Sequence, residues 1–258
     1  MRVTFLGTGT SQGVPVIGCD CAVCASPDPH DRRLRVSVLV ETQGKRILID
    51  AGPDLRQQML RAGVRGLDAV LLTHEHMDHI AGMDDLRAFS FSHEPPKAVP
   101  IYGDEPTLRA VRRVYEYAFT ENRYPGVPEF ELRVIDRQPF LVEGVAVRPI
   151  EVMHMRMPVL GFRIGGFTYI TDAKTILPDE LDKIRGTGTL VLNALRENEH
   201  YSHLSLSEAL AIVEEVKPRQ TWFTHISHLM GTHATTNARL PEHARIAHDG
   251  LVVELPEP

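Results

Sequence analysis

The segment His74–His79, which reads HEHMDH, constrains the fold of this chain more than any other feature. It places three imidazoles and two carboxylates in six residues, directly after the apolar run at 67–72. Imidazole is mostly uncharged at neutral pH, so the cluster repels itself little while it offers nitrogen and oxygen ligands to divalent cations. One metal can take the first two histidines, and a second can take Asp78 and His79. The segment therefore predicts a two-metal hydrolytic site rather than a histidine-rich surface turn.

Residue patterning predicts an α/β protein. Apolar alternation and β-branched residues predict strands at 2–6, 36–41, 45–50, 67–72, 131–135, 138–142, 145–150, 160–164, 167–171, 188–193 and 220–224. Turn residues predict hairpins at Gln43-Gly44, Gly165-Gly166 and Asp249-Gly250. We expect helices from Pro53 to about Arg61, at 105–119 behind an Asp104 N-cap, after Pro178, and up to Val216 behind Ser205 or Ser207. This order fits two packed sheets flanked by helices, although periodicity alone does not separate it from a mixed α/β layer fold.

Composition limits the class of protein. With 43% hydrophobic and 24% charged residues, the 258-residue chain is typical of a globular protein, and we expect one domain over 1–258. The net charge of −6 argues against a general nucleic-acid or membrane surface. The first residues lack a long apolar signal region, and no apolar run approaches the length of a membrane helix. We therefore expect a cytoplasmic protein.

Four isolated ligand-type residues each stand at the end of a predicted strand: Asp50, His154, Asp172 and His225. Rigid strand ends are where loops present functional side chains. Taken singly, a histidine in such a place is more often a hydrogen-bonded structural residue. Together with His74–His79, the four residues favour a metal centre.

The ordered set of motifs resembles the metallo-β-lactamase superfamily. H-x-H-x-D-H after an apolar strand is followed by spaced His, Asp and His, and the early segments Gly7-Thr8-Gly9-Thr10-Ser11 and Asp50-Ala51-Gly52 also match that superfamily. The resemblance covers essentially the whole chain. It implies an αββα four-layer sandwich, in which two mixed β-sheets are packed together and flanked by helices.

The resemblance also implies a ligand set and two divalent ions in the active site. One metal is expected on His74, His76 and His154, and the other on Asp78, His79 and His225, with Asp172 bridging them. Asp50 is expected behind the ligands, where it accepts a ligand imidazole's remaining N–H. Carboxylate with imidazole suits Zn, Mn or Fe, and the sequence does not choose between them.

All three cysteines lie in one short segment, as Cys19, Cys21 and Cys24. The C-x-C-x2-C spacing supplies three thiolates to one tetrahedral ion, and an odd number of clustered cysteines is a poor disulfide framework. Free buried thiols and a redox pair are the alternatives. His228, three residues after His225, is the candidate fourth ligand for a structural zinc. Such a zinc would clamp the long irregular segment 8–35.

The cysteine pattern narrows the resemblance to one branch of the superfamily. G-C-x-C-x2-C at 18–24 and T-H-I-S-H at 224–228 are similar to the phosphoribosyl 1,2-cyclic phosphodiesterase branch of carbon–phosphorus lyase pathways. That branch implies a catalytic histidine near 200, for which His203 is favoured and His200 is the alternative. Arg156 is a candidate phosphate ligand, and Arg196 is a weaker one.

These features predict a dinuclear-metal hydrolase, most directly a phosphodiesterase. A hydroxide between the metals would attack a small, even cyclic, phosphodiester, with Asp78 among the groups essential for catalysis and His203 as proton donor. The alternatives are a tRNA 3′-processing-type nuclease, a thioester or lactone hydrolase, and a non-catalytic, metal-loaded accessory protein of coenzyme biosynthesis. Relatives suggest a homodimer, and nucleic acid is a disfavoured partner because the chain lacks a basic stripe.

Overall fold

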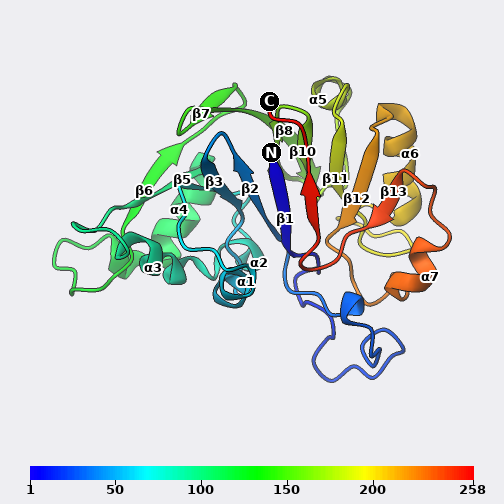
Figure 1. Ribbon diagram of the computed structural model, residues 1–258, viewed down its shortest axis with the longest axis horizontal. Coiled ribbons are helices and arrows are strands. Elements are labelled where there is room, and N and C mark those ends of the chain that lie inside the picture. The colour runs from blue at the N-terminus through cyan, green and yellow to red at the C-terminus, as the bar shows by residue number, and fades with distance from the viewer.

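The computed structural model describes residues 1–258 as two seven-stranded sheets packed face to face (Figure 1). The first sheet has the order β14 (Val252–Glu254), β1 (Arg2–Gly7), β2 (Ser37–Thr42), β3 (Lys45–Ile49), β4 (Ala69–Leu71), β5 (Val99–Gly103), β6 (Phe130–Val134). The second has the order β13 (Ala244–Ile246), β12 (Gln220–Thr224), β11 (Thr189–Asn193), β10 (Phe167–Tyr169), β9 (Met157–Ile164), β8 (Val145–His154), β7 (Phe140–Val142). Each sheet joins an antiparallel half to a parallel half.

Helices cover the outer face of each sheet (Figure 1). The helices are α1 (Leu55–Ala62), α2 (Met77–Ile80), α3 (Arg87–Ser90), α4 (Glu105–Val114), α5 (Pro178–Ile184), α6 (Leu206–Val216) and α7 (His233–Asn237), with short 3-10 turns at Pro29–Asp31, Met83–Leu86 and Glu116–Ala118. One apolar core of 22 buried residues fills the space between the sheets, and one core of 19 lies between each sheet and its helices. These three cores separate four layers and confirm the αββα sandwich. None of the helices combines the length and the hydrophobicity that a bilayer span requires.

Local sequence explains the well-predicted elements. Asp104 accepts a hydrogen bond from the Thr107 amide at 3.0 Å and so begins α4. Ser205, rather than Ser207, is the N-cap of α6, where it forms a capping box with Glu208. The predicted hairpin turn at Gln43-Gly44 is confirmed between β2 and β3, and that at Gly165-Gly166 is confirmed between β9 and β10.

Two predictions differ from the structure. The helix predicted over 105–119 ends at Val114, and a 3-10 turn follows it. The hairpin predicted at Asp249-Gly250 is wrong, because β13 belongs to the second sheet and β14 pairs with β1 in the first. Asp249 instead accepts hydrogen bonds from the Thr8 hydroxyl at 2.8 Å and the Leu34 amide at 2.9 Å, so it anchors the crossing between the sheets.

Strand direction places the predicted ligands at one edge of the sandwich. β3 runs parallel to β4, and β10 runs parallel to β12 through β11. β8 has the same direction as β10, since β9 is antiparallel to both. The carboxyl ends of these strands share one edge within each sheet, and the grouping of residues that follow strands of both sheets shows that the two edges meet. The loop between β1 and β2 extends away from the sheets there (Figure 1).

Candidate metal centre

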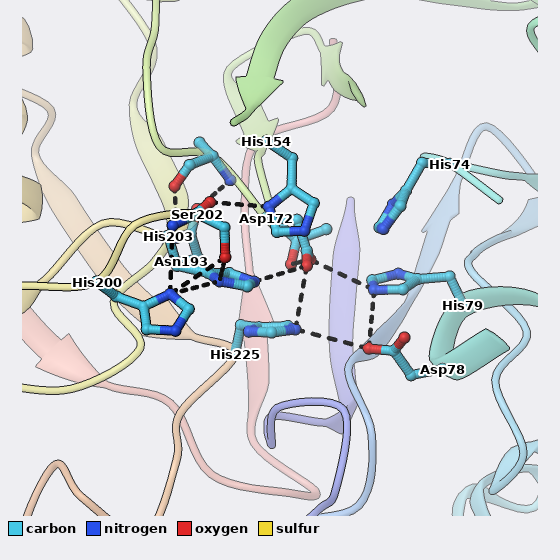
Figure 2. Close-up of polar contacts among 12 residues, drawn as sticks. His74, Asp78, His79, His154, Asp172, Asn193, His200, Ser202, His203 and His225 are labelled. Carbon is cyan, nitrogen blue, oxygen red and sulfur yellow. Dashed lines mark hydrogen bonds and ion pairs between the residues drawn. The ribbon is translucent and has the colours of Figure 1, made fainter. Parts of the chain in front are cut away.

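The predicted ligands come together at this shared edge. His74, His79 and Asp172 form one group whose ligand atoms lie within 4.8 Å of one another, and Asp78, His79 and His225 form another. Figure 2 shows these side chains around Asp172, with His154 on the side of the second sheet. His76 is more exposed, and its ring lies 4.6 Å from that of His74 and 5.2 Å from that of His154. The structure thus brings the whole predicted set together.

Asp50 orients His79 through the ring nitrogen that points away from the centre. The His79 Nδ1–H donates to Asp50 Oδ2 at 2.7 Å, which is the contact that the sequence predicts for this aspartate. Its other oxygen accepts the Thr73 amide at 2.8 Å. Because Nδ1 is occupied, His79 presents Nε2 to Asp78 and Asp172, at 3.2 and 3.3 Å. Although burial opposes a charged imidazole, the carboxylates of Asp50, Asp78 and Asp172 raise the pKa of His79 well above its ordinary value.

Several buried imidazole nitrogens at the centre have no hydrogen-bond partner: His74 Nε2, His79 Nε2 and both ring nitrogens of His225. An unpaired buried polar atom is costly, and native proteins rarely leave one. Here the Nε2 atoms of His79 and His225 face the carboxylates of Asp78 and Asp172, with His225 Nε2 3.3 Å from Asp172 Oδ1. Divalent cations among these atoms would satisfy the Nε2 atoms of His74, His79 and His225, but not His225 Nδ1. The residues present therefore fit a pair of metal ions.

Backbone conformation sets the direction of three site residues. Asp50, Asp172 and His225 follow β3, β10 and β12, and each has a positive φ, of 63°, 57° and 57°. Left-handed backbone is uncommon outside glycine, though Asp and His tolerate it better than most residues. Such strain persists where the surrounding structure fixes it, and it concentrates at functional sites. Here it turns the side chains out of the strand direction and toward the centre.

The predicted proton donors differ in position. His203 is buried, and its Nε2 lies 3.0 Å from Asp172 Oδ1, while its ring stacks on His225 at 4.8 Å (Figure 2). His200 is half-buried, and its polar contacts are with Ser202 and His203. Burial lowers the pKa of His203 to about 4, although Asp172 opposes this shift. The geometry favours His203 over His200 as the group that reaches the reacting atoms.

Sequence reasoning missed Ser202, which joins three of the histidines. Its hydroxyl lies 2.9 Å from His203 Nδ1 and 3.1 Å from His200 Nδ1. The Nδ1–H of His154 donates to its carbonyl at 2.8 Å, which turns the other nitrogen of His154 toward the centre. The position of Ser202 between His200 and His203 was the one sequence feature that could have indicated its role.

The cysteine segment forms a second centre. His228 Nδ1 lies 3.3, 3.5 and 3.4 Å from the sulfurs of Cys19, Cys21 and Cys24. A tetrahedral zinc with bonds of about 2.3 Å to sulfur and 2.0–2.1 Å to nitrogen would separate these atoms by about 3.5 Å. The spacing fits a structural zinc, and the thiols are free of disulfide bonds. The end of β12 therefore contributes His225 to one centre and His228 to the other.

The two arginines have different surroundings. Arg156 is exposed at the turn between β8 and β9, where it lines a depression with His76 and His154. Arg196 donates to the carbonyls of Asn198 and Glu199 at 3.2 and 2.7 Å. Its guanidinium thus holds the loop that carries His200. These two contacts use only Nε and Nη2 of a half-buried guanidinium, so the role of Arg196 as a phosphate ligand stays a prediction.

The glycine of the early Asp50-Ala51-Gly52 motif is required because the backbone of Asp78 lies close to it. A Cβ at this position would lie 2.0 Å from the carbonyl oxygen of Asp78. The Ala51 amide donates to the His79 carbonyl at 2.7 Å, so this segment supports α2 and its two ligands directly.

We expect Gly52→Ala to displace Asp78, because neither backbone can yield without breaking this contact. Overpacking of this kind costs about 1–3 kcal/mol of unfolding free energy, or a fall in Tm of roughly 3–10 °C. Thermal melting and metal analysis check it, with Gly166→Ala as a control for glycine replacement, since Gly166 lies outside the left-handed region and nothing lies within 4 Å of a Cβ there. Unchanged metal content in Gly52→Ala would contradict the proposed support of Asp78.

Comparison with known proteins agrees with this architecture. The β-lactamase superfamily domain model matches residues 45–226. A solved diphosphatase of the PhnP family has a TM-score of 0.93 and 41% identity, with 99% of this chain and 98% of that chain covered. An octanoyltransferase of Porphyromonas gingivalis is 42% identical over 97% of this chain and 51% of the relative. A ribonuclease Z of Bradyrhizobium diazoefficiens is 35% identical over 57% of this chain and 45% of the relative.

The chain spans about half the length of these two curated relatives. The family match, in contrast, covers the strands and loops that carry most of the metal centre, from β3 to the end of β12. The fold, the ordered ligands and this match lead to one assignment: the chain belongs to the β-lactamase superfamily.

Proposed function

We propose that this protein is a metal-dependent hydrolase that cleaves small phosphodiesters, cyclic ones included. The observation that carries the proposal is the buried set of unpartnered imidazole nitrogens around Asp172, with His203 3.0 Å from that carboxylate. The 41% identity to a PhnP-family diphosphatase supports the placement of the chain in the cyclic phosphodiesterase branch.

His74, His76 and His154 would hold one metal, and Asp78, His79 and His225 the other, with Asp172 shared between them. When bound, two divalent ions supply the Lewis acidity that activates water and neutralises charge on a phosphate. Asp50 keeps His79 in the tautomer that presents Nε2. The three cysteines and His228 would hold the structural zinc away from the reaction.

His203 is proposed as the proton donor to the leaving oxygen. Its Nε2 lies 3.0 Å from Asp172, so if Asp172 held metal, the Nε2–H of His203 would be placed to donate to a substrate oxygen beside that carboxylate. Its pKa of about 4 leaves it neutral near pH 7 without substrate. A phosphate anion beside Nε2 favours the protonated form, so protonation accompanies substrate binding. Arg156 at the rim of the depression would contact a phosphate oxygen.

The direct test is an assay of bis-p-nitrophenyl phosphate and cyclic nucleotides with protein loaded with Mn²⁺ or Zn²⁺. We expect turnover that chelation abolishes. If metal-replete protein cleaves no phosphodiester, the proposal is wrong.

The ribonuclease Z relative favours a second candidate, tRNA 3′ processing. The net charge of −6 counts against it, because tRNA binding depends on a cationic surface. Binding to tRNA that weakens steeply with salt would support this candidate. We further propose a cytoplasmic homodimer, which light scattering of the purified protein tests for oligomeric state.

We expect His203→Ala to lower turnover by about 10²–10⁴-fold for an ester with a poor, alkoxide leaving group. The loss is smaller for a p-nitrophenolate, which leaves without a proton. His200→Ala is the matched control, since His200 has no polar contact with the ligand side chains. Equal losses for both kinds of ester, or a larger loss in His200→Ala, would remove His203 from this role.

A further inference from the structure

Three large apolar side chains are exposed beside the metal centre: Met77 at 53%, Met155 at 54% and Tyr201 at 71%. Each is adjacent in sequence to a site residue, respectively Asp78, His154 and His200. Exposed methionine and tyrosine at a catalytic site offer adaptable apolar contact that does not stabilise the fold. Met77 is set on α2 among the ligands, whereas the other two belong to loops of the second sheet.

A depression of about 390 Å³ connects two of these side chains, Met155 and Tyr201, with the centre. Its lining includes Met155, Met157 and Tyr201 together with His76, His154 and Arg156. The volume is that of a small-molecule pocket. A molecule bound there would meet the ligand histidines at one end and a thioether and phenol surface at the other.

Met155 has a strained, left-handed backbone conformation. It is one of the two residues in the turn between β8 and β9, and its φ is +57°. Glycine or asparagine is usual in such a turn, since a side chain at positive φ is strained. The side chain is 54% exposed, so its burial offsets little of this strain. Strain of this kind points to a role in binding.

Tyr201 is oriented for stacking. Its ring lies 4.3 Å from that of His200, with 33° between the planes. Arg196 holds the same loop through the carbonyls of Asn198 and Glu199. The phenol is therefore supported on one side and exposed on the other, as a platform for a planar ring.

We infer that this apolar subsite, formed by Met155, Met157 and Tyr201, binds the base of a nucleotide whose phosphate lies at the metal centre. The inference rests on the proposed function and narrows its substrate class to small nucleoside phosphodiesters and diphosphates. A ribose phosphate without a base leaves the subsite empty. Arg156, beside the subsite and without an ion pair in the structure, would contact the phosphate.

Binding of AMP and of ribose 5-phosphate separates the base from the phosphate. Isothermal titration of the metal-loaded protein should give a Kd for AMP at least about tenfold lower than the Kd for ribose 5-phosphate. Stacking of the base on an aromatic ring contributes binding free energy of this size. In Tyr201→Ala the Kd for AMP should rise about tenfold while that for ribose 5-phosphate stays within twofold. Tyr201→Phe should retain most of the AMP affinity. Tyr124→Ala, a 57% exposed tyrosine outside the depression, should change neither.

Met155→Gly tests the strain argument. We expect Tm to rise by about 2–4 °C, because glycine relieves the positive φ, while AMP binds several-fold more weakly. A purely structural methionine would not produce both effects.

The outcomes are distinguishable from those of the activity assay. Equal affinity for AMP and ribose 5-phosphate, or an unchanged ratio in Tyr201→Ala, overturns the subsite even if phosphodiesters are cleaved. Preferential AMP binding by a protein that cleaves no phosphodiester keeps the subsite and rejects the proposed function.

Discussion

Replacing Asp172 by alanine should remove the metal pair and lower phosphodiester turnover by on the order of 10³-fold or more. Asp172 is buried and lies within 3.3 Å of nitrogens from His79, His203 and His225. Asp78 also approaches His79 and His225, at 3.2 and 3.7 Å, but only Asp172 contacts His203 as well, so its loss removes the carboxylate that all three imidazoles share. Burial would raise the pKa of Asp172, but His225 and His79 hold this pKa well below its usual range. The Asp172 side chain is therefore a carboxylate that is available to a metal.

Elemental analysis by mass spectrometry measures the metal content of the parent protein and of the variant. We expect about three metals per chain in the parent protein and about one in Asp172→Ala, the one at the cysteines. Asp179→Ala, on the exposed side of α5, is the control and should keep all three. Circular dichroism establishes that both variants fold. Three metals in folded Asp172→Ala would contradict the proposed bridging position.

Cys21→Ser/Cys24→Ser should lose one metal, keep the active-site pair and melt at a lower temperature. The cluster joins residues 209 positions apart, from Cys19 to His228. A cross-link over so long a loop stabilises by up to about 5 kcal/mol in the chain-entropy model, and we expect a fall in Tm of roughly 10 °C.

The same variant should expose the segment 11–35 to proteolysis, because this long connection depends on the zinc and a few hydrogen bonds for its order. Ile17→Ala is a suitable control on the same loop, since Ile17 is 99% exposed. It should change neither the metal content nor the cleavage pattern. A melting temperature equal to that of the parent would show that the cysteine centre does not clamp the loop.

The sequence predicted well which side chains converge, because strand direction decides where they lie. An apolar strand followed by HEHMDH, and single His or Asp residues after other strands, places donors at strand ends, and parallel strands end at the same edge. Asp50 fitted the same rule, and its hydrogen bond to His79 follows from its position beside β4. The local motifs also predicted the capped starts of α4 and α6, where the cap and its partner lie within three residues.

Contacts between distant segments could not be predicted in this way. Asp249-Gly250 has hairpin residues, yet the chain crosses between sheets there, because the second sheet takes β13 and the first takes β14. Nothing in the local pattern states which sheet a short strand joins. The contacts of Arg196 with the carbonyls of Asn198 and Glu199 likewise depend on the loop conformation, which the local pattern does not specify.

By itself the sequence determined which side chains can bind metal and that they stand at strand ends, because residue chemistry and strand periodicity are local properties. The tertiary structure decided how those donors are shared. The packing of the two sheets turns His225 toward Asp172 and His228 toward the cysteines, and it buries His203 at the centre while His200 stays at the rim. These choices depend on the relative position of loops far apart in the chain, which only the packed core fixes.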